Sequence, residues 1–215
     1  MKNILYLGSK SKSRQKLLDI AEIPYKILGH TADECSIDLS HDFEQYVLNI
    51  AKHKMENVNL PKSLDNEEMF ILTADTLVQT KNTKQILGKP ENKQDAIRMV
   101  KISNQEPIKV TTGCCLEKRS SLRQNYGRQK ISNRSWKVLD KRYWTTSATI
   151  EFYIEENYIE KYFEKLPLAL KGCGAEIVDD YGLNFLESIN GSFTTVLGLP
   201  LFELRQNLKE LGFFN

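Results

Sequence analysis

Cysteine is scarce in this sequence, and its spacing excludes two kinds of protein. The chain of 215 residues has four cysteines, at positions 35, 114, 115 and 173, and no Cys-x-x-Cys pair. Structural zinc sites and small secreted domains need closely spaced or numerous cysteines. We therefore expect neither a zinc site nor a disulfide framework, and the cysteines are interpreted as reduced structural thiols.

The sequence also lacks long hydrophobic runs. No apolar stretch approaches the roughly 20 residues that span a bilayer. The "ILYL" run near the N-terminus is too short for the core of a signal peptide. A cytoplasmic protein without a membrane segment is therefore expected. A Ser/His/Asp nucleophile set is not evident either, since His30, His41 and His53 are scattered along the chain.

Basic residues are concentrated in one segment. Residues 117–142 contain nine of the 30 lysines and arginines and two of the 28 acids, which leaves 21 bases and 26 acids elsewhere. Tyr126 and Trp136 in this segment, and Tyr143 directly after it, have rings of the kind that stack on nucleic acid. Blocks of like charge are most often solvated surface. We therefore favour an exposed basic insertion over a nucleic-acid-binding face.

The order of hydrophobic patterns predicts an α/β fold with a mixed sheet. Strand patterns occur at 3–8, 25–28, 69–75, 108–116, 136–139 and 144–153, with a hairpin at 76–88, and helical patterns occur at 12–22, 42–58, 91–102, 155–164 and 200–211. The alternation favours α/β, and the hairpins argue against a purely parallel sheet.

The stretch "LGSKSKSRQKLL" places bases where a helix normally begins with acids. If Ser11 is the N-cap, Lys12 and Arg14 fill the first turn, although the positive end of a helix favours acids. Lys12 and Lys16 are expected to point into water. Arg14 lies one turn before Leu18 and should face the protein. Because a serine-rich turn at a helix start suits phosphate, Arg14 is a candidate anion ligand.

A lysine and an aspartate also lie in unusual places. Lys54 follows Val47 and Ile50 on the apolar stripe of its predicted helix, so it must extend to solvent, pair with an acid or meet a ligand. Asp75 comes after a buried run at the predicted end of a strand, where open α/β sheets place ligand-binding groups, and Thr76 adds a hydroxyl. Aspartate at a strand end also commonly begins a turn.

A second base is predicted at a helix start. Pro90 suits the first position of the next helix, and it holds Lys89 extended immediately before that helix. Together with Arg14, Lys54 and Asp75, Lys89 predicts a site for a polyanion, with an acid for metal or proton chemistry.

Seven segments resemble, in order, the motifs of the Maf-like nucleoside triphosphate pyrophosphatases. They are "LGSKSKSRQKLL", "IPYKILGHTADE", "YVLNIAKHK", "LTADTLV", "ILGKPENKQDA", "TTG" and "INGSFTTVLGLPLFEL". The resemblance extends from Ile4 to about Leu208, and only 117–142 matches poorly, as an enlarged hairpin-like insertion. It implies one Maf-like domain over residues 1–215, with an elongated mixed sheet flanked by helices, as in Maf and inosine triphosphatase-like proteins.

The resemblance implies an activity as well. Members of this family hydrolyse a canonical or modified nucleoside triphosphate between the α and β phosphates, giving a monophosphate and pyrophosphate. They use a divalent metal, Mg²⁺ or Mn²⁺, and a homodimer is expected. The implied cellular role is the removal of unwanted or modified nucleotides.

The family's N-terminal motif matches this chain in part. Its Ser-x-Ser corresponds to Ser9 and Ser11, and the second of its paired arginines corresponds to Arg14. The first arginine is replaced by Ser13. The resemblance thus implies a phosphate clamp at this helix start that is weakened but not abolished.

The remaining charged motifs match position by position. The family's acidic segment ends at Glu34, its helix lysine is Lys54, its Ala-Asp-Thr acid is Asp75, and its Gly-Lys-Pro lysine is Lys89. The resemblance makes Asp75, Glu34 and Lys54 catalytic, and carboxylate oxygens of Asp75 and Glu34 suit Mg²⁺. Which acid is the base and which is the metal ligand stays open.

One late motif departs from the family. Where the family has Gly-Ala-Tyr-x-Ile followed by Gln or Glu, this chain reads "GAEIVDD". Glu176 replaces the aromatic residue, and Asp179 replaces the Gln or Glu as a candidate substrate ligand. A non-catalytic regulator of septum formation that binds nucleotide or nucleic acid is therefore kept as the alternative function.

Overall fold

A mixed seven-stranded sheet organises the computed structural model, which describes residues 3–33, 37, 42–61, 68–122 and 135–215. The strand order is β2-β1-β3-β5-β6-β7, and β4 pairs with β3. Strand β1 is parallel to β2 and β3, whereas β3–β4 and β6–β7 are antiparallel. The strands are β1 (Leu5–Leu7), β2 (Tyr25–Ile27), β3 (Glu68–Thr80), β4 (Ile86–Leu87), β5 (Ile108–Leu122), β6 (Ser135–Phe152) and β7 (Leu186–Asn190). The predicted α/β fold with a mixed sheet is confirmed.

Helices flank the strands. The α-helices are α1 (Lys12–Ile20), α2 (Phe43–Glu56), α3 (Lys93–Ser103), α4 (Ile159–Lys165), α5 (Phe193–Val196) and α6 (Leu201–Glu210). The 3₁₀ helices are η2 (Glu156–Tyr158), η3 (Pro167–Lys171), η4 (Cys173–Ala175) and η5 (Asp180–Phe185). Among the described residues, no helix has the length and apolar character needed to cross a membrane.

The predicted strands were too short. The patterns at 69–75 and 76–80 belong to one strand, β3, and those at 136–139 and 144–153 belong to one strand, β6. Strand β7 and the 3₁₀ helices were not predicted. Pairing with neighbouring strands extends a strand beyond its apolar centre, and this pairing is not visible in local periodicity.

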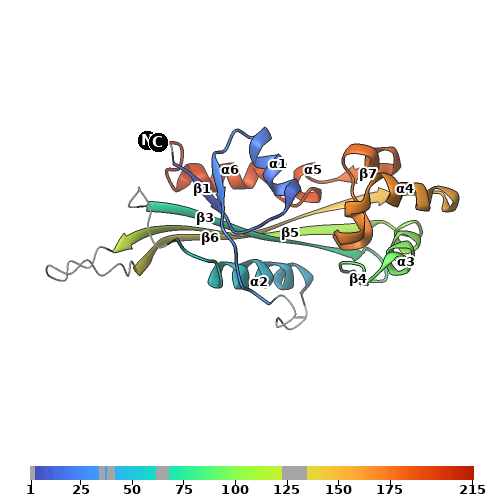
Figure 1. Ribbon diagram of the computed structural model, residues 1–215, viewed down its shortest axis with the longest axis horizontal. Helices are drawn as coiled ribbons and strands as arrows, with labels where there is room; N and C mark the ends of the chain where they lie inside the picture. Colours follow the sequence, from blue (N-terminus) through green and yellow to red (C-terminus); the bar gives the residue numbers. More distant parts are fainter. Residues whose placement is uncertain (1–2, 34–36, 38–41, 62–67, 123–134) are drawn as a thin grey trace. The chain divides into compact units, whose positions relative to one another are not determined.

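The chain divides into two compact units. The first contains residues 1–75, 113–144 and 201–215, and the second contains 76–112 and 145–200. Strands β3, β5 and β6 contribute residues to both units. Within the first unit, α1 and α6 lie on one side of the strands and α2 lies on the other (Figure 1). The predicted single domain stays a prediction.

The first unit is held together at both chain ends and beneath α2. The amide Nδ2 of Asn3 donates to the carbonyl oxygen of Phe213 at 2.8 Å, and the rings of Phe70 and Phe213 form an edge contact at 5.1 Å. Gly113 of β5 lies directly under α2, because a Cβ atom there would be 2.9 Å from the backbone N and Cα of Leu48. Helix α2 therefore packs on the strands at backbone distance.

The second unit has its own aromatic core. Phe152, Tyr162 and Phe185 form mutual edge contacts with ring centroids 5.6 to 6.2 Å apart. Gly182 lies against the backbone, since a Cβ atom there would be 1.6 Å from the carbonyl oxygen of Ile177. Only glycine fits at this position. The segment that departs from the family motif is thus packed tightly against this core.

Candidate functional site

The start of α1 forms a hydrogen-bonded cluster of two serines and an arginine. Ser11 is the N-cap, and its hydroxyl accepts from the backbone N–H of Arg14 at 3.4 Å. The hydroxyl of Ser9 accepts from the N–H of Ser11 at 3.2 Å and from Arg14 Nη1 at 3.0 Å. Arg14 is only 8% exposed. The predicted cap and the predicted inward position of Arg14 are both confirmed.

The other polar residues of this helix start face outward. Lys12, Ser13 and Lys16 are exposed, as predicted for the two lysines. Ser13, which stands where the family has an arginine, is therefore on the solvent side of α1. The guanidinium that the helix start directs inward comes from Arg14, and Ser9 fixes its orientation.

Gly8 brings this cluster against β3. Its backbone N–H donates to the carbonyl oxygen of Leu72 at 2.8 Å. A Cβ atom at Gly8 would lie 2.7 Å from Cγ2 of Thr73, so a larger residue would push the chain away. The Ser9–Arg14 cluster therefore begins at a close backbone contact with the strand that carries Asp75.

Lys54 and Asp75 form a buried ion pair within the first unit. Lys54 Nζ lies 2.5 Å from Asp75 Oδ1, and the two side chains are 7% and 10% exposed. Of the three outcomes considered for Lys54, the structure shows pairing with an acid. In a dry environment such a pair is stable only with both partners present, because one alone would be an uncompensated buried charge.

A threonine that the sequence did not single out fixes α2 beside this pair. Thr73 Oγ1 donates to the carbonyl oxygen of Ala51 at 2.7 Å. Thr73 and Asp75 are two residues apart on β3, so their side chains share the face that α2 covers. Residues two apart in a strand face the same side, so the position of Asp75 could have indicated Thr73.

The predicted position of Asp75 at a strand end was wrong. Strand β3 continues to Thr80, so Asp75 lies in its interior. Buried side chains recur at Val78 and Thr80, and β4 pairs with Val78 and Gln79. This pairing extends the strand. Asp75 is thus held by a hydrogen-bonded strand, a more rigid support than a loop.

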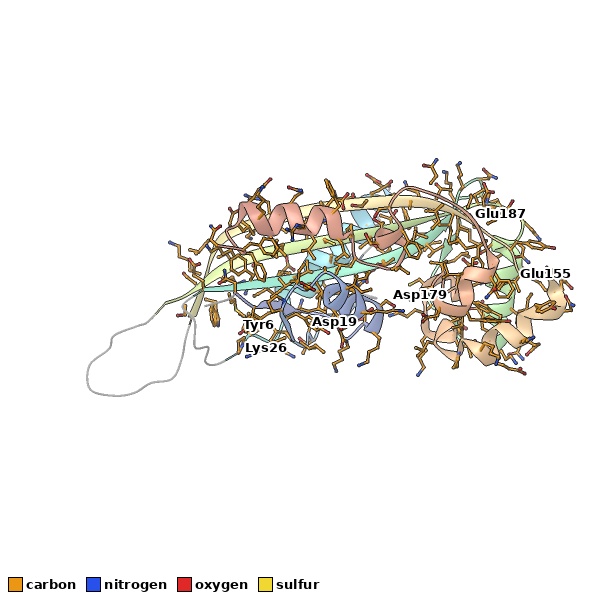
Figure 2. The ribbon with its side chains drawn as sticks, turned by 90° about the horizontal axis from the view of Figure 1, so that it is seen from above. Tyr6, Asp19, Lys26, Glu155, Asp179 and Glu187 are labelled. Carbon is orange, nitrogen blue, oxygen red and sulfur yellow. The ribbon has the colours of Figure 1, made fainter. Side chains whose placement is uncertain are left out.

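Three predicted substrate ligands belong to the second unit. Thr76 shares a hydrogen bond of 2.9 Å with the hydroxyl of Thr112, which donates to the carbonyl oxygen of Thr195. Lys89 is exposed, and Asp179 is half-buried immediately before η5. Figure 2 shows Asp179 among the second unit's side chains.

The predicted helix start at Lys89 and Pro90 was wrong. Helix α3 begins at Lys93, and the side chain of Asn92 caps it by accepting from the N–H of Asp95 at 3.0 Å. Asp95 lies in the first turn, the arrangement that the helix dipole favours. A good cap at Asn92 therefore starts the helix later, and Lys89 is not adjacent to its N-terminus.

Glu176, which replaces the family's aromatic residue, is half-buried, with its carboxylate group turned away from solvent. Both carboxylate oxygens are buried without a hydrogen-bond partner among the described residues. Burial raises the pKa of Glu176 to about 8, an effect that nearby Ser103 opposes. The hydroxyl of Ser103 itself donates to the carbonyl oxygen of Met99 at 3.2 Å. Glu176 therefore holds a proton at neutral pH.

The cysteines that the structure describes form no disulfide. Cys114 and Cys115 are buried, and Cys173 is half-buried. Burial, with a contribution from nearby Glu117, raises the pKa of Cys115 to about 12. The thiols of Cys114 and Cys115 are therefore protonated at neutral pH. Cys35 lies outside the described residues.

Most bases in the described part of 117–142 lie close to acids. Arg119 Nε lies 2.7 Å from Glu117, Lys118 Nζ lies 2.9 Å from Glu68, and Arg142 pairs with Asp140. Residues 123–134, which include Tyr126, lie outside the described residues. The described strands of this segment thus carry ion pairs rather than a uniform positive face.

One predicted metal ligand, Asp75, can be located in the structure. Glu34 lies outside the described residues, so Asp75 is the one predicted metal ligand that can be placed. Within the described residues, no group of three His, Cys, Asp or Glu side chains could hold a metal ion. A magnesium ion commonly uses one or two carboxylates together with waters and substrate phosphates, so a single buried aspartate is compatible with it.

The fold and these clusters define an α/β protein whose first unit carries two buried charged clusters, Ser9–Arg14 and Lys54–Asp75. The chain belongs to the Maf family, because the model of the family described as Maf-like protein matches residues 4–211. The recognition made from the sequence motifs is confirmed.

Curated relatives span nearly the whole chain. A dTTP/UTP pyrophosphatase of Clostridium botulinum is 31% identical over 99% of this chain and 98% of its own length. The protein of the same name from Acholeplasma laidlawii is 29% identical over 97% of each chain. Among solved structures, a HAM1 protein from Coxiella burnetii has a TM-score of 0.41 at 11% identity, covering 97% of this chain and 99% of its own.

Proposed function

We propose that this protein is a nucleoside triphosphate pyrophosphatase. The observation that carries the proposal is the burial of two cations, Arg14 and Lys54, in the unit that also holds Asp75. The names of the relatives support the same activity, and they make dTTP and UTP the first substrates to test. The products would be the nucleoside monophosphate and pyrophosphate.

Arg14 and the two serines would bind the phosphates. The guanidinium offers paired donors to phosphate oxygens, and Ser9 already holds it in one orientation at 3.0 Å. The free N–H groups at the start of α1 add a positive dipole end. Phosphate binding would therefore replace the acids that this helix start lacks.

Lys54 and Asp75 would perform the chemistry. A phosphate oxygen that approaches Lys54 competes for its ammonium group and releases the carboxylate of Asp75 to orient a water molecule. The water oxygen then bonds to the α-phosphorus, the bridging oxygen leaves with pyrophosphate, and Asp75 accepts the proton. Charge developing on the phosphate oxygens would be stabilised by Lys54 and Arg14.

The metal would be held by Asp75, together with Glu34. When bound, Mg²⁺ or Mn²⁺ supplies positive charge to the triphosphate oxygens. The roles of Lys89, Thr76 and Asp179 as substrate ligands stay predictions. The homodimer and the cytoplasmic location expected from the sequence stay predictions.

Pyrophosphate release from a panel of canonical and modified triphosphates, with and without EDTA, tests the proposal. We expect release from dTTP or UTP that EDTA abolishes. Asp75→Asn should lower turnover by at least about 100-fold, the range typical of a lost general base. Glu164→Gln, an exposed acid on α4, is the matched control. If no triphosphate in the panel releases pyrophosphate, the proposed activity is wrong.

A further inference from the structure

A cavity separate from the residues proposed for hydrolysis lies within the second unit. It has a volume of about 430 Å³ and is lined by residues of η2, η5 and β7 and by Tyr153 and Glu155, which follow β6. Its walls include the rings of Tyr153, Tyr158, Tyr181 and Phe185. This volume is in the range of small-ligand sites, and none of these residues has a role in the proposed hydrolysis.

The aromatic walls are supported by the core behind them. The rings of Tyr181 and Phe185 make an edge contact at 5.7 Å, and Phe185 in turn contacts Phe152 and Tyr162. The backbone N–H of Tyr153 donates to the carbonyl oxygen of Phe185 at 2.9 Å, which joins the end of β6 to η5. The cavity is therefore formed without a ligand.

The charged side chains that line the cavity are acidic. Glu155 and Glu187, both exposed and both labelled in Figure 2, lie in its wall, and the lining residues that the structure describes include no base. The faces of aromatic rings are also negative. An anionic nucleotide is therefore disfavoured here, and a cation with an apolar body is favoured.

One aromatic residue of the wall already attracts a cation. The ammonium group of Lys161 lies 5.5 Å from the centroid of the Tyr158 ring. Tyr153 is 53% exposed, so its ring is accessible to a ligand, whereas Lys161 already lies over the ring of Tyr158. Aromatic rings combined with carboxylates are the arrangement that binds alkylated ammonium groups.

We propose that this cavity binds a small organic ammonium cation. The alkyl groups would contact the tyrosine rings, and Glu155 and Glu187 would balance the charge. The binding is separate from pyrophosphate release, since its residues differ from those proposed for hydrolysis. Disproof of one proposal therefore does not affect the other.

Calorimetric titration of the full chain with choline tests this site. The control ligand is the neutral tert-butyl analogue of choline, which has the same shape without the charge. We expect choline to bind at least about 10-fold more tightly than its analogue, and Tyr153→Leu and Glu187→Gln each to weaken choline binding about 3- to 30-fold. Circular dichroism would verify the fold of each variant.

Tyr143→Leu is the matched aromatic control, because Tyr143 is similarly exposed but lies in the first unit. It should leave choline binding unchanged. Equal binding of the neutral analogue, no binding of choline, or choline binding that is unaffected in both cavity variants would each overturn the proposal.

Discussion

Buried charge distinguishes Arg14, Lys54 and Asp75 from most charged residues of the first unit. Each is less than 10% exposed, whereas Lys12 and Lys16 on the same helix as Arg14 are solvated. Removing a charged group from water costs several kcal/mol unless a partner compensates it. The pairing of Lys54 with Asp75 supplies that compensation for both groups, and Ser9 accepts a hydrogen bond from Arg14.

Removing one partner of the buried pair should destabilise the protein. We expect Asp75→Asn to lower the free energy of unfolding by about 3 kcal/mol, because it leaves the Lys54 ammonium group buried without its counter-charge. The double variant Lys54→Met/Asp75→Asn should recover at least half of this loss. Urea unfolding measures both values, and a single variant as stable as the wild type would contradict the buried pairing.

Arg14 should contribute mainly to substrate binding. Arg14→Gln removes a charge-assisted contact of about 1.5–3 kcal/mol, so KM for dTTP should rise about 10- to 100-fold. Ser9→Ala should have a smaller effect, since it removes only the group that orients the guanidinium. Lys12→Gln is the matched control on the solvent side of α1, and steady-state kinetics of the three variants compare them. An unchanged KM in Arg14→Gln would exclude this role.

Glu176 should make stability depend on pH. Its pKa is about 8 in the folded protein against 4.5 for an ordinary glutamate. The folded state therefore retains a proton that the unfolded state loses. The stability contribution is full below the unfolded pKa and is lost as the pH rises through about 8, by an amount on the order of a few kcal/mol.

The neutral variant Glu176→Gln tests this dependence. Its free energy of unfolding should fall less between pH 5 and pH 9 than that of the wild type, and it should exceed the wild-type value at pH 9. Urea unfolding at the two pH values measures the difference, with Glu164→Gln as the control for an exposed acid. Identical pH slopes for wild type and Glu176→Gln would mean that Glu176 is solvated.

At the scale of elements, the contact between α2 and β5 determines where Lys54 lies. Gly113→Ala would place a Cβ atom 2.9 Å from the backbone of Leu48, so α2 must move away from the strands. We expect a loss of about 1–3 kcal/mol, measured as a lower thermal midpoint. Gly88→Ala is the control, since no atom lies within 4 Å of the added Cβ. Equal midpoints for the two variants would contradict this packing.

At the scale of the whole molecule, charge pairing bears on the alternative function. The net charge is +2, and the described bases of 117–142 pair largely with acids. We expect weak binding to single-stranded or duplex DNA, with little change between about 50 and 200 mM salt. Fluorescence anisotropy measures this. Steeply salt-dependent binding that is lost when the bases of 117–142 are neutralised would favour the regulator instead.

Much of the candidate site was predictable from local sequence, because helix periodicity and helix capping depend on neighbouring residues. A helix repeats every 3.6 residues, so the spacing of Arg14 to Leu18 and of Lys54 to Ile50 predicts which side chains face inward. Ser11 is a good cap because its hydroxyl satisfies a free N–H group, and this too is a local property. Each of these predictions depends on residues within two turns of one another.

The remaining features of the candidate site depend on contacts between residues that are far apart in the sequence. Asp75 became an interior strand residue because β3 pairs with β4 beyond it, and Lys54 found its partner because α2 packs on β3. The burial of Glu176 depends likewise on elements far from it in the chain. The sequence by itself determined the α/β class and the inward direction of Arg14 and Lys54. Only the tertiary structure decided the partners of Arg14 and Lys54. The helical repeat shows which side chains face inward, but it does not show which element packs against them.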